Sequence, residues 1–342
     1  MNKTENISLL SRHMNKTSLF VFLNTGIIRS IVTFLLSVSI GEFYQLCFHA
    51  GGSRAMLLAR IDIHLENIES FFILFASLVL VKMILDYAEN YLMNKASENF
   101  VQELRDKIFK TQIEWPNEYF GRRHFGKYLL RYSNDMKAVQ NYLSRGIYGG
   151  CRDVLFLMVG VTILYLIHIQ LATMYIVLMA ASVIIIFYAS SRQIPLIENS
   201  RNKRNRLLAF VTKSFQRHTR IKTAEIEERT ISRFDNYSQE LKVLNLKNHK
   251  FDSLLLVLFT FLQYCIIIFL LFKIYQLHQD ANSKLDIGSA LVFLLVVLQI
   301  NPTLKRIMKV PSILNKGKIS LKKIERIRPI IASAALPDNL SQ

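Results

Sequence analysis

The sequence predicts an all-α membrane protein with six transmembrane helices and two long helical hairpins on the cytoplasmic side. Hydrophobic residues make up 51% of the 342 positions, and mean hydropathy is +0.25. Charged residues make up only 20%, which is low for a soluble domain of this size. Glycine (12) and proline (6) are scarce, so long helices are expected rather than the short strands of a membrane β-barrel.

Six apolar segments are close to the length of about 20 helical residues that crosses a bilayer. They lie near residues 19–50, 70–92, 154–168, 171–188, 254–276 and 287–310. The third and fourth are joined by a tight turn around 168–171, which predicts a helical hairpin. Residues 1–18 are polar and show no cleavage pattern of small residues. The first apolar segment is therefore expected to be a retained membrane helix, not a signal peptide.

Charge placement predicts the orientation. Eleven Lys or Arg residues lie between Lys95 and Arg152, and fourteen lie between Arg192 and Lys250. The loops on the opposite side carry only Arg54, Arg60 and Lys284. Under the positive-inside rule, both long connectors and both termini face the cytoplasm. The net charge of +18 is explained in the same way, so no nucleic-acid partner is expected.

Both long connectors are rich in helix-forming residues. No proline interrupts residues 70–114, and a continuous helix there would be about 68 Å long, more than twice the hydrocarbon thickness. That helix is expected to end before Pro116. The cytoplasmic hairpins are placed at about 93–153 and 189–253. They belong to one domain, 19–327, between an N-terminal segment (1–18) and a C-terminal tail (328–342).

The first connector carries aromatic, glycine and charged residues at regular offsets. A basic helix, 104–109, leads to the aromatic pair Tyr119 and Phe120. A glycine follows six residues later, an arginine five after that and an aspartate four further on. These are Gly126, Arg131 and Asp135. This pattern resembles the first intracellular loop of ABC exporters.

Two later stretches also resemble that family. In the second connector, Lys222 precedes a short stretch with Glu225 and Glu227, and Phe234 follows. In the last part, residues 285–288 open the sixth span, 302–304 lie near its inner end, and 320–324 resemble the closing helix. Together the likeness covers 19–327. Lys213, Arg217 and Lys323 depart from the family's usual residues at those places.

The resemblance implies that the hairpin tips are coupling helices, near 117–123 and 224–230, that dock on an ATPase. The expected coupling residues are Asn117, Glu118, Tyr119, Phe120, Gly121, Arg122, Ala224, Glu225, Ile226, Glu227 and Glu228. Residues expected to shape the loops are Gly126, Arg131, Asp135, Lys222 and Phe234. Two simpler alternatives stay open: Tyr119 and Phe120 pack inside their own hairpin, or Arg131 and Asp135 form only a surface ion pair.

No G-x-x-x-x-G-K-[ST] phosphate-binding motif occurs in the sequence, so the chain is not expected to hydrolyse ATP by itself. ATP and Mg²⁺ would be bound by a separately encoded subunit, and this chain would hold no cofactor. Neither the three cysteines nor the eight histidines show metal-ligand spacing. Six spans cannot enclose a large pathway, so a second permease copy, identical or related, is expected beside the membrane lipid.

Polar residues within or near the spans are candidates for a substrate path or for contacts between helices. They are Asp86, Glu89, Asn90, Gln263, Gln299, Asn301 and Thr303. Lys82 and Asp86 are spaced to neutralise each other, and the basic run 201–206 is expected to face water near anionic headgroups.

The sequence therefore predicts the permease subunit of a split ABC transporter in the bacterial inner membrane, exporting a hydrophobic or amphipathic substrate. Two alternatives remain. A proton-driven carrier on the same fold would need acidic residues such as Asp86 and Glu89 to carry protons, and a non-transporting protein would act as a receptor or immunity factor.

Overall fold

The computed structural model describes residues 16–48, 68–114, 132, 135–279 and 287–325. Within these ranges the chain is helical and contains no strand. The helices are α2 (Lys16–Phe48), α4 (Ile68–Ile113), α7 (Met136–Asn141), the π-helix η2 (Tyr142–Tyr148), α8 (Gly149–Ile167), α9 (Ile169–Ser191), α10 (Ile194–Gln216), α11 (His218–Thr223), α12 (Glu227–Gln279), α13 (Ile287–Ile307) and α14 (Val310–Glu325).

Six helical stretches in this part of the chain are long and apolar enough to cross a membrane. They correspond in order to the six predicted spans, which confirms the predicted fold class. The prediction of helices far longer than a bilayer is also confirmed. α4 has 46 residues and α12 has 53, which corresponds to about 69 Å and about 80 Å.

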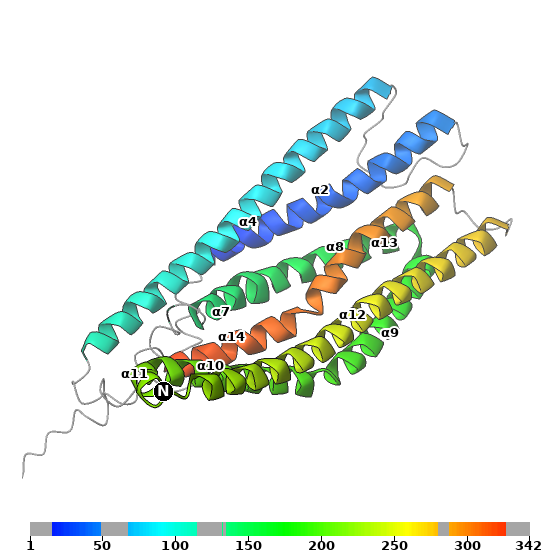
Figure 1. Ribbon diagram of the computed structural model, residues 1–342. Coiled ribbons are helices and arrows are strands. Elements are labelled where there is room, and N and C mark those ends of the chain that lie inside the picture. Colours follow the sequence, from blue (N-terminus) through cyan, green and yellow to red (C-terminus); the bar gives the residue numbers. More distant parts are fainter. Residues whose placement is uncertain (1–15, 49–67, 115–131, 133–134, 280–286, 326–342) are drawn as a thin grey trace, which may run out of the picture. The chain divides into compact units, whose positions relative to one another are not determined.

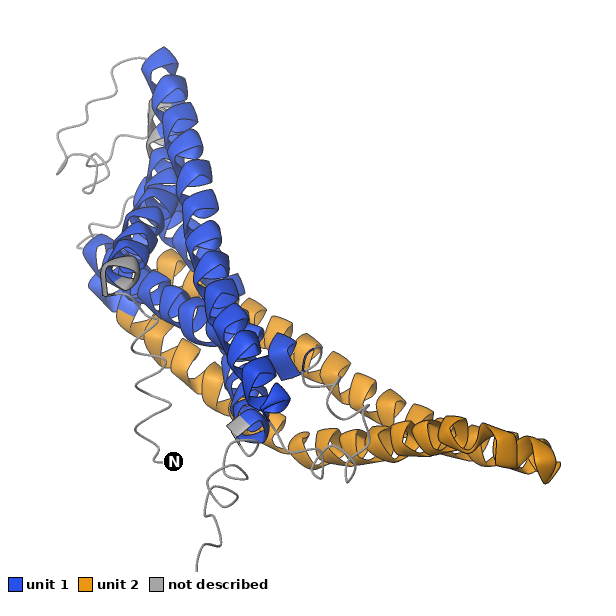
Figure 2. Ribbon diagram, turned by 90° about the vertical axis from the view of Figure 1, so that its left-hand side faces the viewer, with its two compact units in different colours: residues 1–172, 277–342 blue, residues 173–276 orange. Residues whose placement is uncertain are grey.

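The chain divides into two compact units, residues 1–172 with 277–342 and residues 173–276 (Figure 2). In the first unit, α2 packs against α4, α8 and α13, and α8 also packs against α13 (Figure 1). Gly160 of α8 allows this close packing. A Cβ there would lie 2.8 Å from Phe34 of α2 and 2.9 Å from Ile300 of α13. Small residues let membrane helices approach one another in this way.

Beyond its apolar segment, α4 continues as one wall of a second apolar core in the same unit. Phe100, Val101 and Ile108 of α4 pack there with residues of α7 and η2 and with Ile324 of α14. α7, η2 and α8 follow one another without a break between Met136 and Ile167, so this core is covalently continuous with a span.

The second unit contains most of α9 and an antiparallel helical hairpin in which α10 leads out and α12 returns (Figure 2). Gln193 donates to Asp252 at 2.6 Å, Ser200 donates to Asn245 at 2.7 Å, and the rings of Phe210 and Tyr237 lie 5.4 Å apart. As the residue number rises on α10 it falls by a similar amount on α12, which defines the register of the pair. α10 and α12 thus form a long helical hairpin.

Short connections separate these elements. His168 is extended between α8 and α9, and its Nδ1 accepts a hydrogen bond from the Leu171 backbone N–H at 3.4 Å. This is the tight turn predicted at 168–171. At the start of α10 a proline occupies the first turn, where a missing N–H costs no helical bond.

Candidate functional site

The tip of the second hairpin is a short helix, α11, closed by a residue in an unusual backbone conformation. Glu225 has a φ of 49°, the left-handed region that usually belongs to glycine. The Ile226 N–H bonds to the Ile221 carbonyl at 3.2 Å, and the Glu225 N–H bonds to the Lys222 carbonyl at 3.2 Å. These two bonds form a Schellman motif, which satisfies carbonyl groups at the end of α11.

The short helix lies earlier than the coupling helix expected at 224–230. Residues 224–226 form the turn, and Glu227, Glu228 and the residues that follow belong to the first turn of α12. Lys222, expected to precede the short helix, is in its last turn. The charges explain this register, because basic residues favour a helix C-terminus and acidic residues favour an N-terminus.

An ion pair joins the two helices across this turn. Lys222 Nζ lies 2.9 Å from Glu227 Oε1, and both side chains are partly exposed. Glu227 is 27 residues before the apolar segment at 254–276, about 40 Å along the helix and outside the membrane-spanning part. The hydrogen bond from Lys222, followed by the bond to its own backbone, lowers the pKa of Glu227 below its usual value.

The predicted coupling residues of the second hairpin are accessible. Ala224, Glu225 and Glu228 are exposed, Ile226 is 41% exposed, and Phe234, predicted to shape the loop, is 40% exposed. Exposed apolar side chains at the end of a hairpin are suited to contact another protein.

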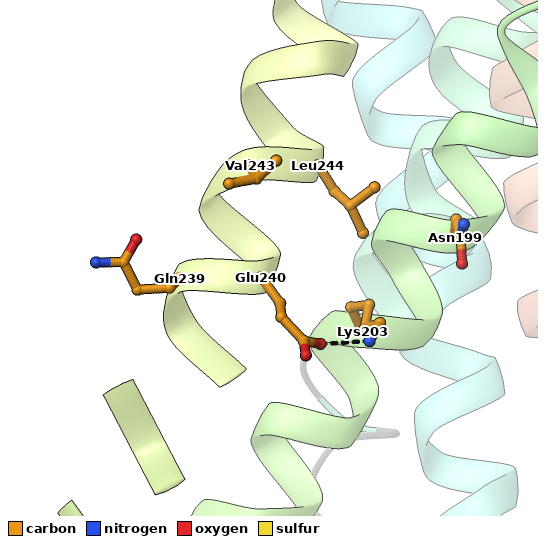
Figure 3. A pocket seen from close by; sticks show the side chains of 6 residues that line it. All are labelled: Asn199, Lys203, Gln239, Glu240, Val243 and Leu244. Atoms are coloured by element: carbon orange, nitrogen blue, oxygen red, sulfur yellow. Dashed lines mark hydrogen bonds and ion pairs between the residues drawn. The ribbon is translucent and has the colours of Figure 1, made fainter. Parts of the chain in front are cut away.

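Nearer the base, a shallow groove between α10 and α12 is lined by Asn199, Lys203, Gln239, Glu240, Val243 and Leu244 (Figure 3). Lys203 and Glu240 form an ion pair across it. This pair joins the two helices midway along the hairpin. We therefore interpret the groove as part of the packing between α10 and α12, and not as a binding pocket.

Most residues of the first predicted tip lie outside the described residues. These are Asn117, Glu118, Tyr119, Phe120, Gly121 and Arg122, together with Gly126 and Arg131. Asp135 is described, and its Oδ1 accepts a hydrogen bond from Ser320 of α14 at 2.9 Å. Asp135 thus fastens the start of α7 to the closing helix, a structural contact with an element far away in sequence.

A buried ion network lies where α2, α4 and α8 meet in the first unit. Arg29 of α2 lies 2.7 Å from Glu89 Oε2 and 3.4 Å from Asp86 Oδ1, both on α4. Its guanidinium carbon lies 5.6 Å from the centre of the Phe156 ring on α8. Asp86 thus pairs with Arg29, an arrangement different from the local pair with Lys82 considered from the sequence. Glu89 is almost fully buried, and its Oε1 has no partner among the described residues.

A second ion cluster connects α8 with α13. Arg306 donates to both carboxylate oxygens of Asp153, at 3.1 to 3.2 Å, and to the Thr303 hydroxyl at 2.8 Å. Arg152 also lies 3.3 Å from Asp153. Thr303 therefore supports an interhelical clamp.

Sequence reasoning missed the Asp153–Arg306 clamp. Its signal was an acidic residue at the start of one predicted span and a basic residue at the end of another. Their 153-residue separation hides the pairing, because local spacing patterns detect only neighbours on one helix.

The remaining path candidates lie on different helices. Asn90 is exposed and donates to the Asp86 carbonyl at 2.8 Å on its own helix. Gln263 lies in the second unit, and Gln299 and Asn301 lie on α13 of the first unit. Each has buried side-chain atoms with no partner among the described residues.

No group of three or more histidine, cysteine, aspartate or glutamate residues in the described ranges could hold a metal ion.

The chain is a multi-pass integral membrane protein. This class is defined by the six apolar helices, the ion-paired bundle and a hairpin that is longer than the bilayer is thick.

Comparison with known proteins assigns the family. The model of the ABC transporter transmembrane region matches residues 19–304, so the chain belongs to that family. A curated relative, the uncharacterized ABC transporter ATP-binding protein YknV of Bacillus subtilis, is 26% identical over 165 residues. The match covers 46% of this chain and 27% of that relative.

Proposed function

We propose that this chain is the permease subunit of an ABC exporter whose ATP hydrolysis is supplied by a separately encoded subunit. That subunit would bind ATP and Mg²⁺. The transported substrate would be hydrophobic or amphipathic, consistent with the apolar faces of the spans.

The observation that carries the proposal is the second hairpin. α10 extends about 35 Å from Gln193 to Gln216, and α12 returns as one uninterrupted helix into an apolar segment. Its tip exposes apolar side chains in the position that the family resemblance assigns to a coupling helix. Such a rigid helix pair transmits a displacement at its tip toward the membrane, because packed helices move as units.

A proton-driven carrier is less well supported. It would need a carboxylate within the membrane that gains and loses a proton. Both acidic candidates, Asp86 and Glu89, lie beside Arg29 and form ion pairs with it. The ion pairs favour a structural role for these two residues.

The working unit would contain two permease copies around a central cavity, with both termini and both hairpins in the cytoplasm of a bacterial cell. The excess of Lys and Arg in the two connectors supports this orientation. ATP-driven closure of the ATPase pair would then switch the cavity from inward-facing to outward-facing.

The test is affinity purification of the full chain from native membranes, followed by reconstitution into vesicles. The proposal requires that a nucleotide-binding subunit co-purifies and that efflux of a lipophilic dye depends on ATP and survives an uncoupler. Loss of efflux with the uncoupler, without an ATPase subunit, would establish the proton-driven carrier instead. A vesicle preparation with neither activity would support the non-transporting alternative.

A further inference from the structure

Two arginines converge on one buried carboxylate near the start of α8 and the end of α13. Asp153 is 2% exposed, and its Oδ1 lies 3.3 Å from Arg152 Nε and 3.1 Å from Arg306 Nη2. Arg306 Nε lies 3.2 Å from each of the two carboxylate oxygens. This arginine pair therefore sets two positive charges against a single negative charge, and one cation is left unbalanced.

Part of each guanidinium group is left without a partner. Arg152 donates only through Nε, so its Nη1 and Nη2 make no hydrogen bond within the described ranges. Arg306 donates through Nε and Nη2, and its Nη1 is likewise unbonded there. The side chain of Arg306 is 47% exposed and that of Arg152 is 18% exposed. Two arginines that a buried carboxylate holds in place are suited to bind phosphate, because guanidinium groups bind it through paired N–H groups.

The charges around the arginine pair leave its exposed side positive. Lys309 follows Arg306 by three residues, is exposed and makes no ion pair within the described ranges. The charge of Arg152 also acts on Glu89 of α4. Glu89, however, is almost fully buried and already pairs with Arg29. Glu89 therefore weakens the positive potential of Arg152 but cannot contact a ligand at the exposed side of the pair.

The arginine pair lies where two apolar segments end. The apolar residues of α8 begin at Val154, directly after Asp153, and α13 reaches its first charged residues at 305 and 306. On α13, Leu298, Pro302 and Arg306 follow one another at intervals of four, so they form one row on the helix surface. All three are exposed. An exposed apolar row that ends in a cation matches the two parts of a phospholipid, its acyl chain and its headgroup.

We propose that Arg152 and Arg306 bind the phosphate group of an anionic phospholipid in the cytoplasmic leaflet, with an acyl chain along the row of Leu298 and Pro302. The phosphate would neutralise the unbalanced cation and join the adjacent ends of α8 and α13. The cytoplasmic leaflet follows from the orientation under the proposed function. The binding itself needs neither an ATPase subunit nor a transported substrate, so it can be tested apart from that function.

A free phosphate ion fits these observations less well. It would reach the same N–H groups but would leave the exposed row of α13 uncovered. A phospholipid fits both features, since its phosphate lies at the depth where a span reaches its first charged residues and its acyl chains lie beside the apolar ones. Basic sites between transmembrane helices at the cytoplasmic surface are suited to such headgroups.

Either arginine can be removed while Asp153 keeps an ion pair. Arg152→Gln leaves Arg306 on Asp153, and Arg306→Gln leaves Arg152 on it. The matched control is Lys318→Gln, which removes one exposed cation of α14 in the same unit that has no ion pair within the described ranges. Asp153→Asn separates an organised site from diffuse attraction, because it makes the surface more positive but no longer holds the two guanidinium groups in place.

The experiment titrates the full-length chain in mild detergent with phosphatidylglycerol or phosphatidylcholine and measures bound lipid by native mass spectrometry. We expect the wild type to prefer phosphatidylglycerol by about tenfold or more. Arg152→Gln and Arg306→Gln should each weaken phosphatidylglycerol binding by about tenfold, as expected for a lost charge-assisted hydrogen bond. Asp153→Asn should weaken it by about threefold, and Lys318→Gln should stay within about twofold of the wild type. Unfolding midpoints without added lipid identify the folded variants, and Arg152→Gln decides the question if Arg306→Gln is unfolded.

Three results would overturn the lipid site. Equal affinity of the wild type for the two lipids would show that the headgroup charge is not recognised. Tighter binding by Asp153→Asn, or an equal loss in Lys318→Gln and Arg152→Gln, would show that diffuse surface charge attracts the lipid. If glycerol phosphate, which has no acyl chain, binds as tightly as phosphatidylglycerol, the arginine pair takes a soluble phosphate instead. In each case the proposed transport function stands, because no ATPase subunit takes part in the measurement.

Discussion

Glu225 carries the one left-handed backbone conformation among the described non-glycine residues. For a residue with a Cβ this conformation costs about 1–2 kcal/mol, and glycine adopts it freely at a larger loss of chain entropy. Glu225→Gly should therefore stabilise the tip by about 0.5–1 kcal/mol. Hydrogen exchange of the Glu225 and Ile226 amides, both bonded in the Schellman motif, should become about two- to fivefold slower.

The matched control is Thr223→Gly, at a helical position two residues earlier. Glycine there loses helix propensity without relieving strain, so exchange at the same amides should become faster. Equal effects of the two glycines would show that the φ of Glu225 is not a source of strain.

Arg29 is the shared partner of two acidic side chains from another helix. Removing one member of a buried ion pair leaves an uncompensated charge and costs about 3–5 kcal/mol, whereas replacing both members by apolar groups costs far less. We expect Arg29→Met to lower the midpoint of thermal unfolding more than the double variant Arg29→Met with Glu89→Leu. Unfolding of the detergent-solubilised chain in a double-mutant cycle measures the difference. A double variant less stable than the single one would contradict a pairing role for Arg29.

At the scale of helices, Gly160 sets the distance between α2, α8 and α13. Gly160→Leu would drive a side chain into Phe34 and Ile300 and should destabilise the bundle by about 1–3 kcal/mol. Gly150→Ala on the same helix is the control, because a Cβ there meets only Val310 at an ordinary 3.4 Å. Thermal unfolding of the two variants in one detergent should separate them, and equal midpoints would argue against close packing at Gly160.

The joint between α11 and α12 should respond to acid. Because the Lys222 hydrogen bond lowers the folded-state pKa of Glu227, the pair stabilises the tip above the ordinary carboxyl pKa of 4.5. That stabilisation disappears as the pH falls through the lowered value. Glu227→Gln should therefore loosen the tip at neutral pH and behave like the wild type in strong acid. The mobility of a spin label at position 224 measures this, and Glu228→Gln, for which no ion pair appears, is the control.

The sequence predicted the helices better than it predicted their contacts. Long proline-free apolar runs determine α4 and α12, because helical hydrogen bonds are local. The short helix α11 lies about six residues before the stretch predicted as a coupling helix, since its end depends on a left-handed glutamate that no propensity favours. The pairing of Arg29 with Asp86 and Glu89 of α4 was not predicted, and neither was the Asp153–Arg306 clamp. Such pairs depend on how distant helices pack.

For the whole molecule, the two hairpins should relay motion from the ATPase to the spans. α4 runs unbroken from Ile68 to Ile113, and the core around Phe100 and Ile108 ties it to η2 and α14. A displacement beyond Ile113 therefore has a rigid path to the apolar segment. The predicted aromatic pair Tyr119 and Phe120 lies just past this end.

Replacing Tyr119 and Phe120 with alanine should uncouple the transporter. In vesicles that contain the ATPase subunit, ATP hydrolysis should persist while ATP-dependent dye efflux falls by about tenfold or more, because the displacement no longer reaches α4. The control replaces Tyr87 and Tyr91 of α4, which are 73% and 52% exposed and lie within or beside its apolar segment. It should leave the ratio of efflux to hydrolysis near that of the wild type. If the Tyr119 and Phe120 variant also keeps that ratio, the aromatic pair packs within its own hairpin, and the second hairpin alone carries the coupling.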